Sequence, residues 1–356
     1  MAHLFSPLKL RKITLKNRIM VSPMQQYCAV EGIPNNWHFV HLGSRAVGGA
    51  GIIMVEATAI TPEARWTTGD LGLWNEQQVE AFQRITKFIK AQGCVPAIQI
   101  GHAGARGSRR LPWDGFDHIP VDQGGWPLVS ASGVAPVPRM PLPRALSIQE
   151  INVVVTDFKK AASRALAAGF EVLGIHGAHG YLIHQFLSPL VNKRKDEYGG
   201  SFDNRIRFLR EIIEAIRSVW PPTHPLFLRI SASDFAPLRL KAWKLEDSIA
   251  LAKAVGPLGI DLITTSGGGL LGFKAPQNDP GCRLTYAERV RREGNIKTSA
   301  VGLITEAQQA DQIIRIGQAD LVAVAREHLR NPYFALHAAK KLGHSVPVPE
   351  PYGRAF

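Results

Sequence analysis

The chain has 356 residues, of which 45% are hydrophobic and 20% charged, so it can bury one large core or two ordinary ones. No run approaches the roughly 18 uncharged apolar residues that a membrane span needs, and the first residues lack the order of a secretory signal. We therefore expect a cytoplasmic protein with no membrane partner. The cysteines, Cys28, Cys94 and Cys282, are too scattered for a disulfide framework or a CxxC metal site, so no structural metal is expected.

The charge balance is strongly basic. Lysine and arginine number 42 against 29 aspartates and glutamates, a formal net charge of +13, which can indicate a nucleic-acid binder. The basic residues, however, occur in small groups along the whole chain, and no block interleaves them with aromatic residues as a base-stacking platform would. This dispersion favours a solvated surface and predicts no nucleic-acid partner.

Short runs rich in valine and isoleucine alternate with longer helical patterns, which is typical of βαβ units and a parallel sheet. Strands are expected at 19–24, 51–60, 95–102, 171–176, 226–233, 261–267, 297–304 and 320–326. Helices are expected at 38–48, 76–93, 148–169, 204–220, 245–255, 286–293, 306–317 and 332–343. Ser147 and Thr305 stand where helix N-caps belong, and Gly93, Gly169, Gly317 and Gly343 follow helix ends.

Eight strand–helix pairs in this length predict an α/β fold, a single (β/α)8 TIM barrel over residues 1–356. A doubly wound sheet is the alternative, but no GxGxxG motif follows the first strand. Two segments depart from the repeat. Residues 103–146, rich in proline and glycine, are long enough for a lid on the catalytic face, and the prolines of 346–356 predict an extended tail.

Barrel enzymes place their chemistry at the C-terminal ends of the strands, and three polar residues cluster after the fourth. His176, His179 and Tyr181 lie within six residues, and the glycines between them let the chain turn sharply. Paired imidazoles suit an oxygen that gains negative charge, and a phenol can supply a proton. The same histidines could ligate a metal, but no third ligand is evident and the next strand ends in the cationic Arg229.

The ends of the last three strands resemble a phosphate site. Gly267–Gly269, Gly302 and Arg326 follow strands six to eight, where barrels commonly bind phosphate. Glycine allows close backbone approach, and arginine can donate two hydrogen bonds to phosphate oxygens. Together they favour a phosphorylated cofactor.

A set of motifs in this order resembles the old yellow enzymes, which are FMN-dependent ene-reductases, and in particular their thermophilic-like subclass that includes xenobiotic reductases. The motifs are Ser22-Pro-Met24, Val55-Glu-Ala57, Gln99-x-x-His102-Ala-Gly104, His176-x-x-His-Gly-Tyr181 and Asp196-x-Tyr-Gly-Gly-Ser201. The resemblance covers essentially the whole chain. Two departures stand out, because Gln25 replaces the usual cysteine after Ser-Pro-Met, and Ala105-Arg106 replaces the usual Arg-Lys.

The resemblance implies a role for each matching residue. His176 and His179 would bind the substrate oxygen, Tyr181 would donate the proton, and Tyr27 would contact substrate. The implied FMN-binding residues are Ser22, Pro23, Met24, Gln25, Ala57, Gln99, Arg229, Gly268, Gly302, Ala325 and Arg326. The tail's Arg354 resembles an arginine that enters the neighbouring subunit's site, which implies a homodimer or a higher homo-oligomer.

The implied activity is NAD(P)H-dependent reduction of the C=C bond of an activated alkene, an α,β-unsaturated carbonyl or nitro compound. Hydride would pass from FMN N5 to Cβ, and an acid would protonate Cα. Longer relatives of the dienoyl-CoA reductase or trimethylamine dehydrogenase type are expected to carry a four-cysteine cluster and a second nucleotide domain after the barrel. The alternative of a different class is a non-catalytic basic binding protein on a barrel scaffold.

Overall fold

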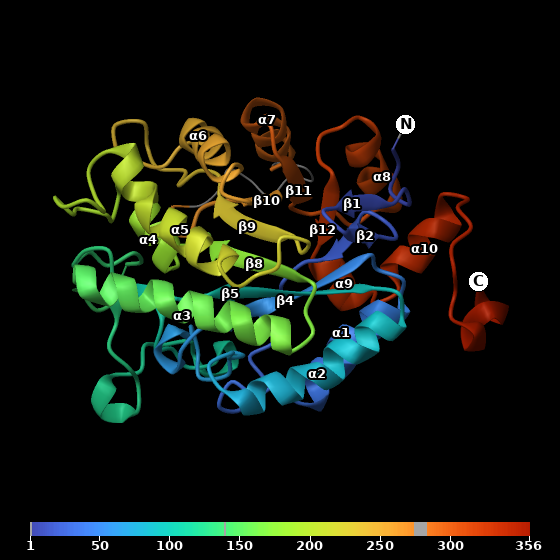
Figure 1. The fold of residues 1–356 in the computed structure, drawn as a ribbon, viewed down its shortest axis with the longest axis horizontal. Helices are drawn as coiled ribbons and strands as arrows, with labels where there is room; N and C mark the ends of the chain where they lie inside the picture. The colour runs from blue at the N-terminus through green and yellow to red at the C-terminus, as the bar shows by residue number, and fades with distance from the viewer. Residues whose placement is uncertain (1, 139, 274–282) are drawn as a thin grey trace.

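The computed structural model describes every residue of the chain except 1, 139 and 274–282. Within the described residues, eight parallel strands close into a barrel in the order β3, β4, β5, β8, β9, β10, β11, β12. Their bounds are Ile19–Val21, Ile52–Ala59, Val95–Gly101, Val172–Gly177, Leu226–Ser231, Leu262–Ser266, Lys297–Val301 and Leu321–Val324. Figure 1 shows the strands at the centre with helices around them. The predicted (β/α)8 barrel and its eight strands are confirmed.

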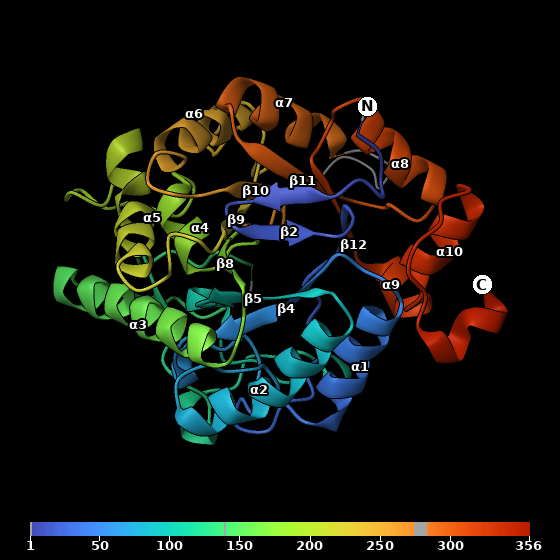
Figure 2. The same ribbon diagram turned by 45° about the vertical axis from the view of Figure 1, so that its right-hand side comes forward.

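The barrel is closed at its N-terminal end by a hairpin that the sequence analysis did not predict. Strands β1 (Leu8–Leu10) and β2 (Ile13–Leu15) pair antiparallel, and Figure 2 shows them lying across the centre of the ring of helices. Their leucines share one buried apolar cluster with Met20 and Phe227 of the barrel. Burying each leucine side chain stabilises the fold by about 1.5–3 kcal/mol, so these contacts hold the hairpin against this end of the barrel. The opposite end is left for the site.

The helices pack their apolar faces on the outside of the barrel. Their bounds are Asn36–Val47 (α1), Glu76–Ala91 (α2), Ile148–Ala167 (α3), Phe202–Arg217 (α5), Leu245–Val255 (α6), Leu284–Gly294 (α7), Ala307–Arg315 (α8) and Phe334–Lys341 (α10). These are the eight predicted helices, with ends shifted by a few residues. Ser147 caps α3 as predicted, since its hydroxyl accepts from the Glu150 N–H at 3.2 Å. The cap predicted at Thr305 is wrong, because α8 begins one residue later with Glu306 as its N-cap.

Two short helices were not predicted. The first, α4 (Leu182–Leu187), follows β8 and is buried on all sides, so it has no polar face whose period could indicate a helix. The second, α9 (Arg326–Arg330), begins where the eighth strand was expected to continue; β12 ends at Val324 instead. As a result Arg326 opens a helix rather than closing a strand.

The 103–146 excursion is held together by short elements. It contains 3-10 turns at Gly104–Arg106, Pro112–Asp114 and Val121–Gln123, and the two-residue strands β6 (Val129–Ser130) and β7 (Arg144–Ala145) pair with each other. Its Phe116 packs edge-on against Trp66 at 5.0 Å between ring centroids. The excursion therefore reaches the loop that follows β4, while its action as a lid stays a prediction.

The C-terminal tail is not extended throughout, as the sequence analysis had expected. Residues Glu350–Ala355 form a 3-10 helix, with proline in its first turn, where a missing N–H costs nothing. The tail rests on α10: the Tyr352 ring lies 5.9 Å from that of Tyr333, and Phe356 stacks on His337 at 5.6 Å. Figures 1 and 2 both show the C-terminus at the edge of the molecule, beside α10.

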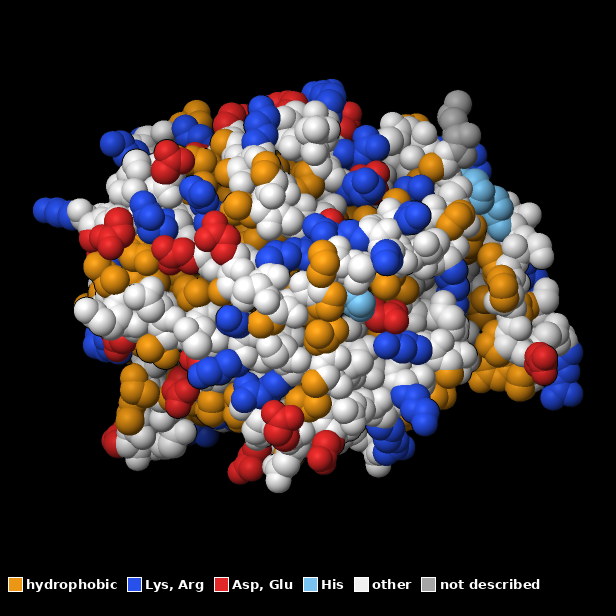
Figure 3. All heavy atoms as spheres, in the orientation of Figure 1, with side chains coloured by type: hydrophobic (Ala, Val, Ile, Leu, Met, Phe, Trp, Pro, Cys, Tyr) orange, Lys and Arg blue, Asp and Glu red, His pale blue; other side chains and the backbone are white. Residues whose placement is uncertain are grey.

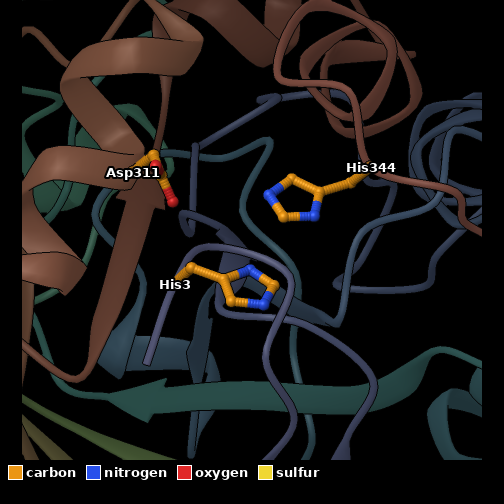
Figure 4. A group of neighbouring side chains, drawn as sticks. All are labelled: His3, Asp311 and His344. Atoms are coloured by element: carbon orange, nitrogen blue, oxygen red, sulfur yellow. The ribbon is translucent and has the colours of Figure 1, made fainter. Parts of the chain in front are cut away.

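The segment before this tail meets the start of the chain. The rings of His3 and His344 stack with centroids 4.4 Å apart and planes 7° apart, and Asp311 of α8 points toward them (Figure 4). The three side chains bring potential ligand atoms within 4.8 Å of one another. Asp311, however, already accepts from the Leu4 N–H at 2.9 Å and pairs with Arg315. We interpret the group as a set of contacts that joins the two ends of the chain. The expected absence of a metal stays a prediction.

The basic surplus is spread over the face of the molecule drawn in Figure 3. On the face shown in Figure 3, Lys and Arg side chains lie among acidic and apolar ones and form no single basic patch. Along the described part of the chain, none of the helices combines the length and the apolar character that crossing a membrane requires.

Candidate active site

Two adjoining cavities lie at the C-terminal ends of the barrel strands. One, of about 250 Å³, is lined by Arg229, Arg283, Gly302, Ala325 and Arg326 among others. The second, of about 180 Å³, is lined by Pro23, Gln25, Ala57, Trp66, Gln99, Arg106, His176, His179, Tyr181 and Arg229. Because Arg229 lines both, the cavities are neighbours. The structure thus brings most of the predicted site residues, from seven of the eight strands and the loops that follow them, to one end of the barrel.

The two histidines lie against each other in the smaller cavity. His176 is at the end of β8, and its Nε2 is 3.4 Å from Nδ1 of His179. The Ala178 N–H donates to His176 Nδ1 at 3.2 Å, so the ring proton of neutral His176 is on Nε2. His179 Nε2 lies 2.7 Å from the Ser266 hydroxyl, which can donate or accept.

Both imidazoles are neutral hydrogen-bond donors at ordinary pH. Burial, with the nearby Arg229 charge as the second cause, lowers the pKa of His176 and of His179 well below 6.5. A protonated pair would add cations beside a buried guanidinium, which the low dielectric disfavours. The pair can therefore polarise an oxygen without a change in its own charge.

Tyr181 completes this group. Its ring stacks on His176 with centroids 4.4 Å apart and planes 17° apart, and it meets Trp66 edge-on at 5.9 Å. Burial, followed by the charge of Asp70, raises the pKa of Tyr181 well above 10. The phenol is therefore protonated, which suits a proton donor. Tyr27 lies beyond Trp66 with its ring 5.9 Å away, and burial raises its pKa as well.

A buried hydrogen-bonded pair that the sequence analysis missed, His184 and Asp234, holds the turn that carries these residues; we call this pair the bracket. His179 has a positive φ of 58°, and the next residue's N–H, that of Gly180, donates to Nδ1 of His184 at 2.9 Å. His184 Nε2 lies 2.9 Å from Asp234 Oδ1, and both side chains are fully buried. Since Nδ1 accepts, the Nε2 proton is donated to Asp234. His184 and Asp234 are positioning residues for the turn.

This bracket predicts a large stability effect. Replacing His184 with leucine removes the donor to a buried carboxylate and should lower the free energy of unfolding by about 3 kcal/mol, as when a buried pair loses one partner. Urea denaturation measures this, with Lys87→Leu, an exposed change on α2, as control, expected within about 0.5 kcal/mol of wild type. A loss below 1 kcal/mol in His184→Leu would show that the bracket is not essential.

The predicted flavin-edge residues occupy one side of the smaller cavity. Ala57 and Gln99 pair in register on β4 and β5, and Arg229 of β9 lies opposite His176 in register. Pro23 and Gln25 come from the loop after β3 and also line the cavity. Ser22 is buried at the base of that loop, where its N–H donates to the Val324 carbonyl at 3.0 Å, and Met24 packs on the barrel's outer core.

The predicted phosphate residues are brought together in part. Gly302, Ala325 and Arg326 all line the larger cavity, and Gly302 has a φ of 129°, a conformation that favours glycine. Gly268 does not belong to the described lining of either cavity; its carbonyl accepts from the Ser231 hydroxyl at 2.7 Å. Arg354 lies in the exposed tail on α10, outside its own chain's site.

The polar groups of the two cavities fit FMN. Both amide atoms of Gln25 and the Nε atoms of Arg229 and Arg283 are buried and lack a hydrogen-bond partner among the described residues. Burial, with the charge of Arg283 second, lowers the pKa of Arg229 to about 10. Two neighbouring guanidiniums need an anion, and an amide needs a partner that both donates and accepts. A phosphate and the pyrimidine edge of a flavin supply these groups.

Sequence reasoning missed several residues that line the two cavities, among them Arg283, Trp66 and Arg106. Arg283 precedes α7, Trp66 follows β4, and Arg106 ends the first turn of the 103–146 excursion; the sequence analysis noted Arg106 only as a departure from the family pattern. Their separation along the chain gave no signal of proximity. Of the cysteines, Cys28 and Cys94 are free thiols, and Cys282 lies outside the described residues.

Comparisons with known proteins agree with this geometry. The family model for the NADH:flavin oxidoreductase / NADH oxidase family matches residues 3–344. An NADPH dehydrogenase of Listeria monocytogenes serovar 1/2a is 43% identical over 100% of both chains, and one of Bacillus subtilis strain 168 is 42% identical over 99% of both.

Solved structures give the same result. Morphinone reductase in complex with tetrahydroNAD matches with a TM-score of 0.78 and 26% identity, covering 99% of this chain and 93% of that one. The old yellow enzyme homologue of Zymomonas mobilis matches with a TM-score of 0.78 and 25% identity, covering 98% and 94%. The chain therefore belongs to the NADH:flavin oxidoreductase / NADH oxidase family, that of the old yellow enzymes, and is an FMN-dependent oxidoreductase with a nicotinamide hydride donor.

Proposed function

We propose that this oxidoreductase is an ene-reductase that reduces the C=C bond of α,β-unsaturated carbonyl or nitro compounds. The observation that carries the proposal is the neutral His176/His179 pair beside protonated Tyr181, in a cavity that also holds the candidate flavin-edge residues. A saturated product needs one hydride at Cβ and one proton at Cα, and FMN when bound supplies the hydride it received from NAD(P)H.

The protein's own residues supply the rest of this chemistry. Hydrogen bonds from the imidazoles to the carbonyl or nitro oxygen draw electron density from the alkene, which makes Cβ electrophilic and stabilises the charge that the oxygen gains. Tyr181 then donates its phenolic proton to Cα. Arg229, a cation in a buried setting, stabilises negative charge on the neighbouring pyrimidine edge. Trp66 and Tyr181 form an aromatic wall of the cavity.

The decisive experiment is an anaerobic titration of the purified protein. NADPH or NADH should bleach the flavin absorbance, and cyclohexenone should then restore it with formation of cyclohexanone. Heat denaturation should release FMN and no FAD. A protein that is reduced by the nicotinamide but is not reoxidised by any activated enone or nitroalkene contradicts ene-reduction. Neither the comparisons nor the surface charge supports the non-catalytic basic binding protein; the absence of a nucleic-acid partner and the cytoplasmic location stay predictions.

We also propose that the enzyme is a homodimer or higher homo-oligomer in which Arg354 serves a partner's site. Three features support this: Arg354 lies outside its own site, the tail is exposed, and its aromatic residues Tyr352 and Phe356 remain 40% and 36% exposed. A contact with a second copy would cover these rings and stabilise the assembly.

A mixing experiment tests this arrangement. Arg354→Ala should raise KM for the alkene while dimerisation changes little. Hybrids of Arg354→Ala with His176→Ala should recover part of the activity, because one of the two sites then has all its residues. Light scattering of the wild type and kinetics of the hybrids measure both effects; a monomer in solution, or full activity after removal of residues 352–356, contradicts the proposal.

A further inference from the structure

The wall of the smaller cavity carries a guanidinium to which no task has been assigned. Arg106 ends the 3-10 turn directly after β5 and lines this cavity with the histidines and Tyr181. Its Nη1 donates to the carbonyl oxygens of His179 at 2.7 Å and Gly269 at 2.9 Å. These two bonds come from different loops and fix the guanidinium in place.

The charge of Arg106 is not neutralised by the protein. Among the residues that the structure describes, no carboxylate pairs with it, and its Nε is buried without a hydrogen-bond partner. The ionisable groups that act on its charge are the phenols of Tyr181 and Tyr27. Both phenols are protonated, so neither supplies a negative charge that would neutralise Arg106. Burial lowers the pKa of Arg106, but an arginine stays protonated in proteins. The cavity therefore offers a cation with an unused donor.

The other cations of the site belong to the cofactor. Arg283, Arg326 and Arg330 line the larger cavity, and Arg229 lies between the two cavities. Arg330 is paired with Glu327. Arg106 lines the smaller cavity and not the larger one. A phosphate in the larger cavity does not pair with it, whereas an anionic group on a substrate in the smaller cavity can.

An aromatic surface adjoins this cation. The Arg106 Cζ lies 5.5 Å from the centre of the Trp66 ring, within cation–π range, and Trp66 meets Tyr181 edge-on. A planar unsaturated molecule can pack on these rings while its carbonyl oxygen accepts from the histidines. A second, anionic group on that molecule would then meet the unused donor of Arg106.

We propose that Arg106 determines specificity and makes the enzyme prefer α,β-unsaturated carbonyl compounds that carry a carboxylate. The proposal rests on the ene-reductase function proposed above. The carboxylate accepts from the guanidinium while the histidine pair polarises the carbonyl, so the substrate is held at both ends. A charge-assisted bond of this kind is strong and directional because both partners are ionised.

The test compares 4-oxopent-2-enoate with its methyl ester in the FMN-loaded enzyme. The enzymes compared are wild type, Arg106→Gln, Arg106→Lys and Arg110→Gln. Arg110 is an exposed arginine of the same excursion, so Arg110→Gln removes the same charge outside the cavity. We expect kcat/KM for the carboxylate to fall at least about tenfold more than that for the ester in Arg106→Gln. Arg106→Lys should keep part of the preference, and Arg110→Gln should keep the wild-type ratio.

Binding measured by calorimetry provides a readout independent of turnover. Wild type should bind 4-hydroxybenzoate more tightly than its methyl ester, and Arg106→Gln should lose this difference. Equal losses for acid and ester, in kcat/KM and in affinity, would overturn the proposal and leave Arg106 as a support for the His179 turn. If neither enone is reduced, ene-reduction fails, and the calorimetric difference alone then decides whether Arg106 binds carboxylates.

Discussion

His176→Ala and His179→Ala should each slow the reduction of cyclohexenone by reduced enzyme about a hundredfold to a thousandfold, the range seen when one donor to a developing oxyanion is removed. Each variant loses one of two donors that meet in the same cavity, 3.4 Å apart. Reduction of the flavin by NADPH should change far less, because it develops no charge on the alkene oxygen. Rapid mixing of each half-reaction separates the two.

The same variants should lose the long-wavelength charge-transfer band that a para-substituted phenol gives with the flavin, since the phenolate oxygen would use both donors. His176→Asn, which keeps a donor, should recover part of the rate, and Lys87→Ala, an exposed change on α2, serves as control. Because burial holds the pKa of both imidazoles far below 6.5, neither becomes charged between pH 6 and 9. The rate should show no histidine titration in that range; unchanged phenol affinity in both alanine variants would contradict the role.

The barrel was predictable from the sequence because its strands are buried on both faces. Such strands read as continuous valine and isoleucine runs, and each run is followed by a helix whose period is visible. The β1–β2 hairpin has three-residue strands, too short for a period, and α4 is apolar on every side. The tail was misread because proline fits the first turn of a helix as well as an extended chain.

The site residues that lie on one stretch of sequence were predictable, whereas those that come from distant loops were not. His176, His179 and Tyr181 follow one strand, so a single stretch of sequence shows that they face one cavity. Trp66 and Arg106 reach the same cavity from other loops, and only closure of the barrel places them there. The bracket of His184 and Asp234 was hidden for the same reason, since 50 residues separate its partners.

Arg283→Gln should weaken FMN binding about tenfold to a hundredfold, which is the loss expected from one charge-assisted bond to phosphate. Arg283 lines the larger cavity with Gly302 and Arg326, and the aliphatic part of its side chain lies 3.5 Å from the position that a Cβ on Gly302 would take. Its Nε is buried without a partner, as expected for a donor that serves a ligand. Titration of the apoprotein with FMN, followed by flavin fluorescence, measures the change.

The stability of the apoprotein distinguishes this binding role from a structural one. Burial lowers the pKa of Arg229, and the charge of Arg283 is the second cause. Without FMN the two guanidiniums therefore repel each other, so removing the charge of Arg283 should leave the free energy of unfolding of the apoprotein equal or higher. With saturating FMN the order should reverse, because the phosphate stabilises the wild type more. Arg292→Gln, an exposed change on the same helix, should alter neither. An Arg283→Gln apoprotein that is less stable than wild type, with unchanged FMN affinity, would mean that Arg283 supports the start of α7 and does not bind phosphate.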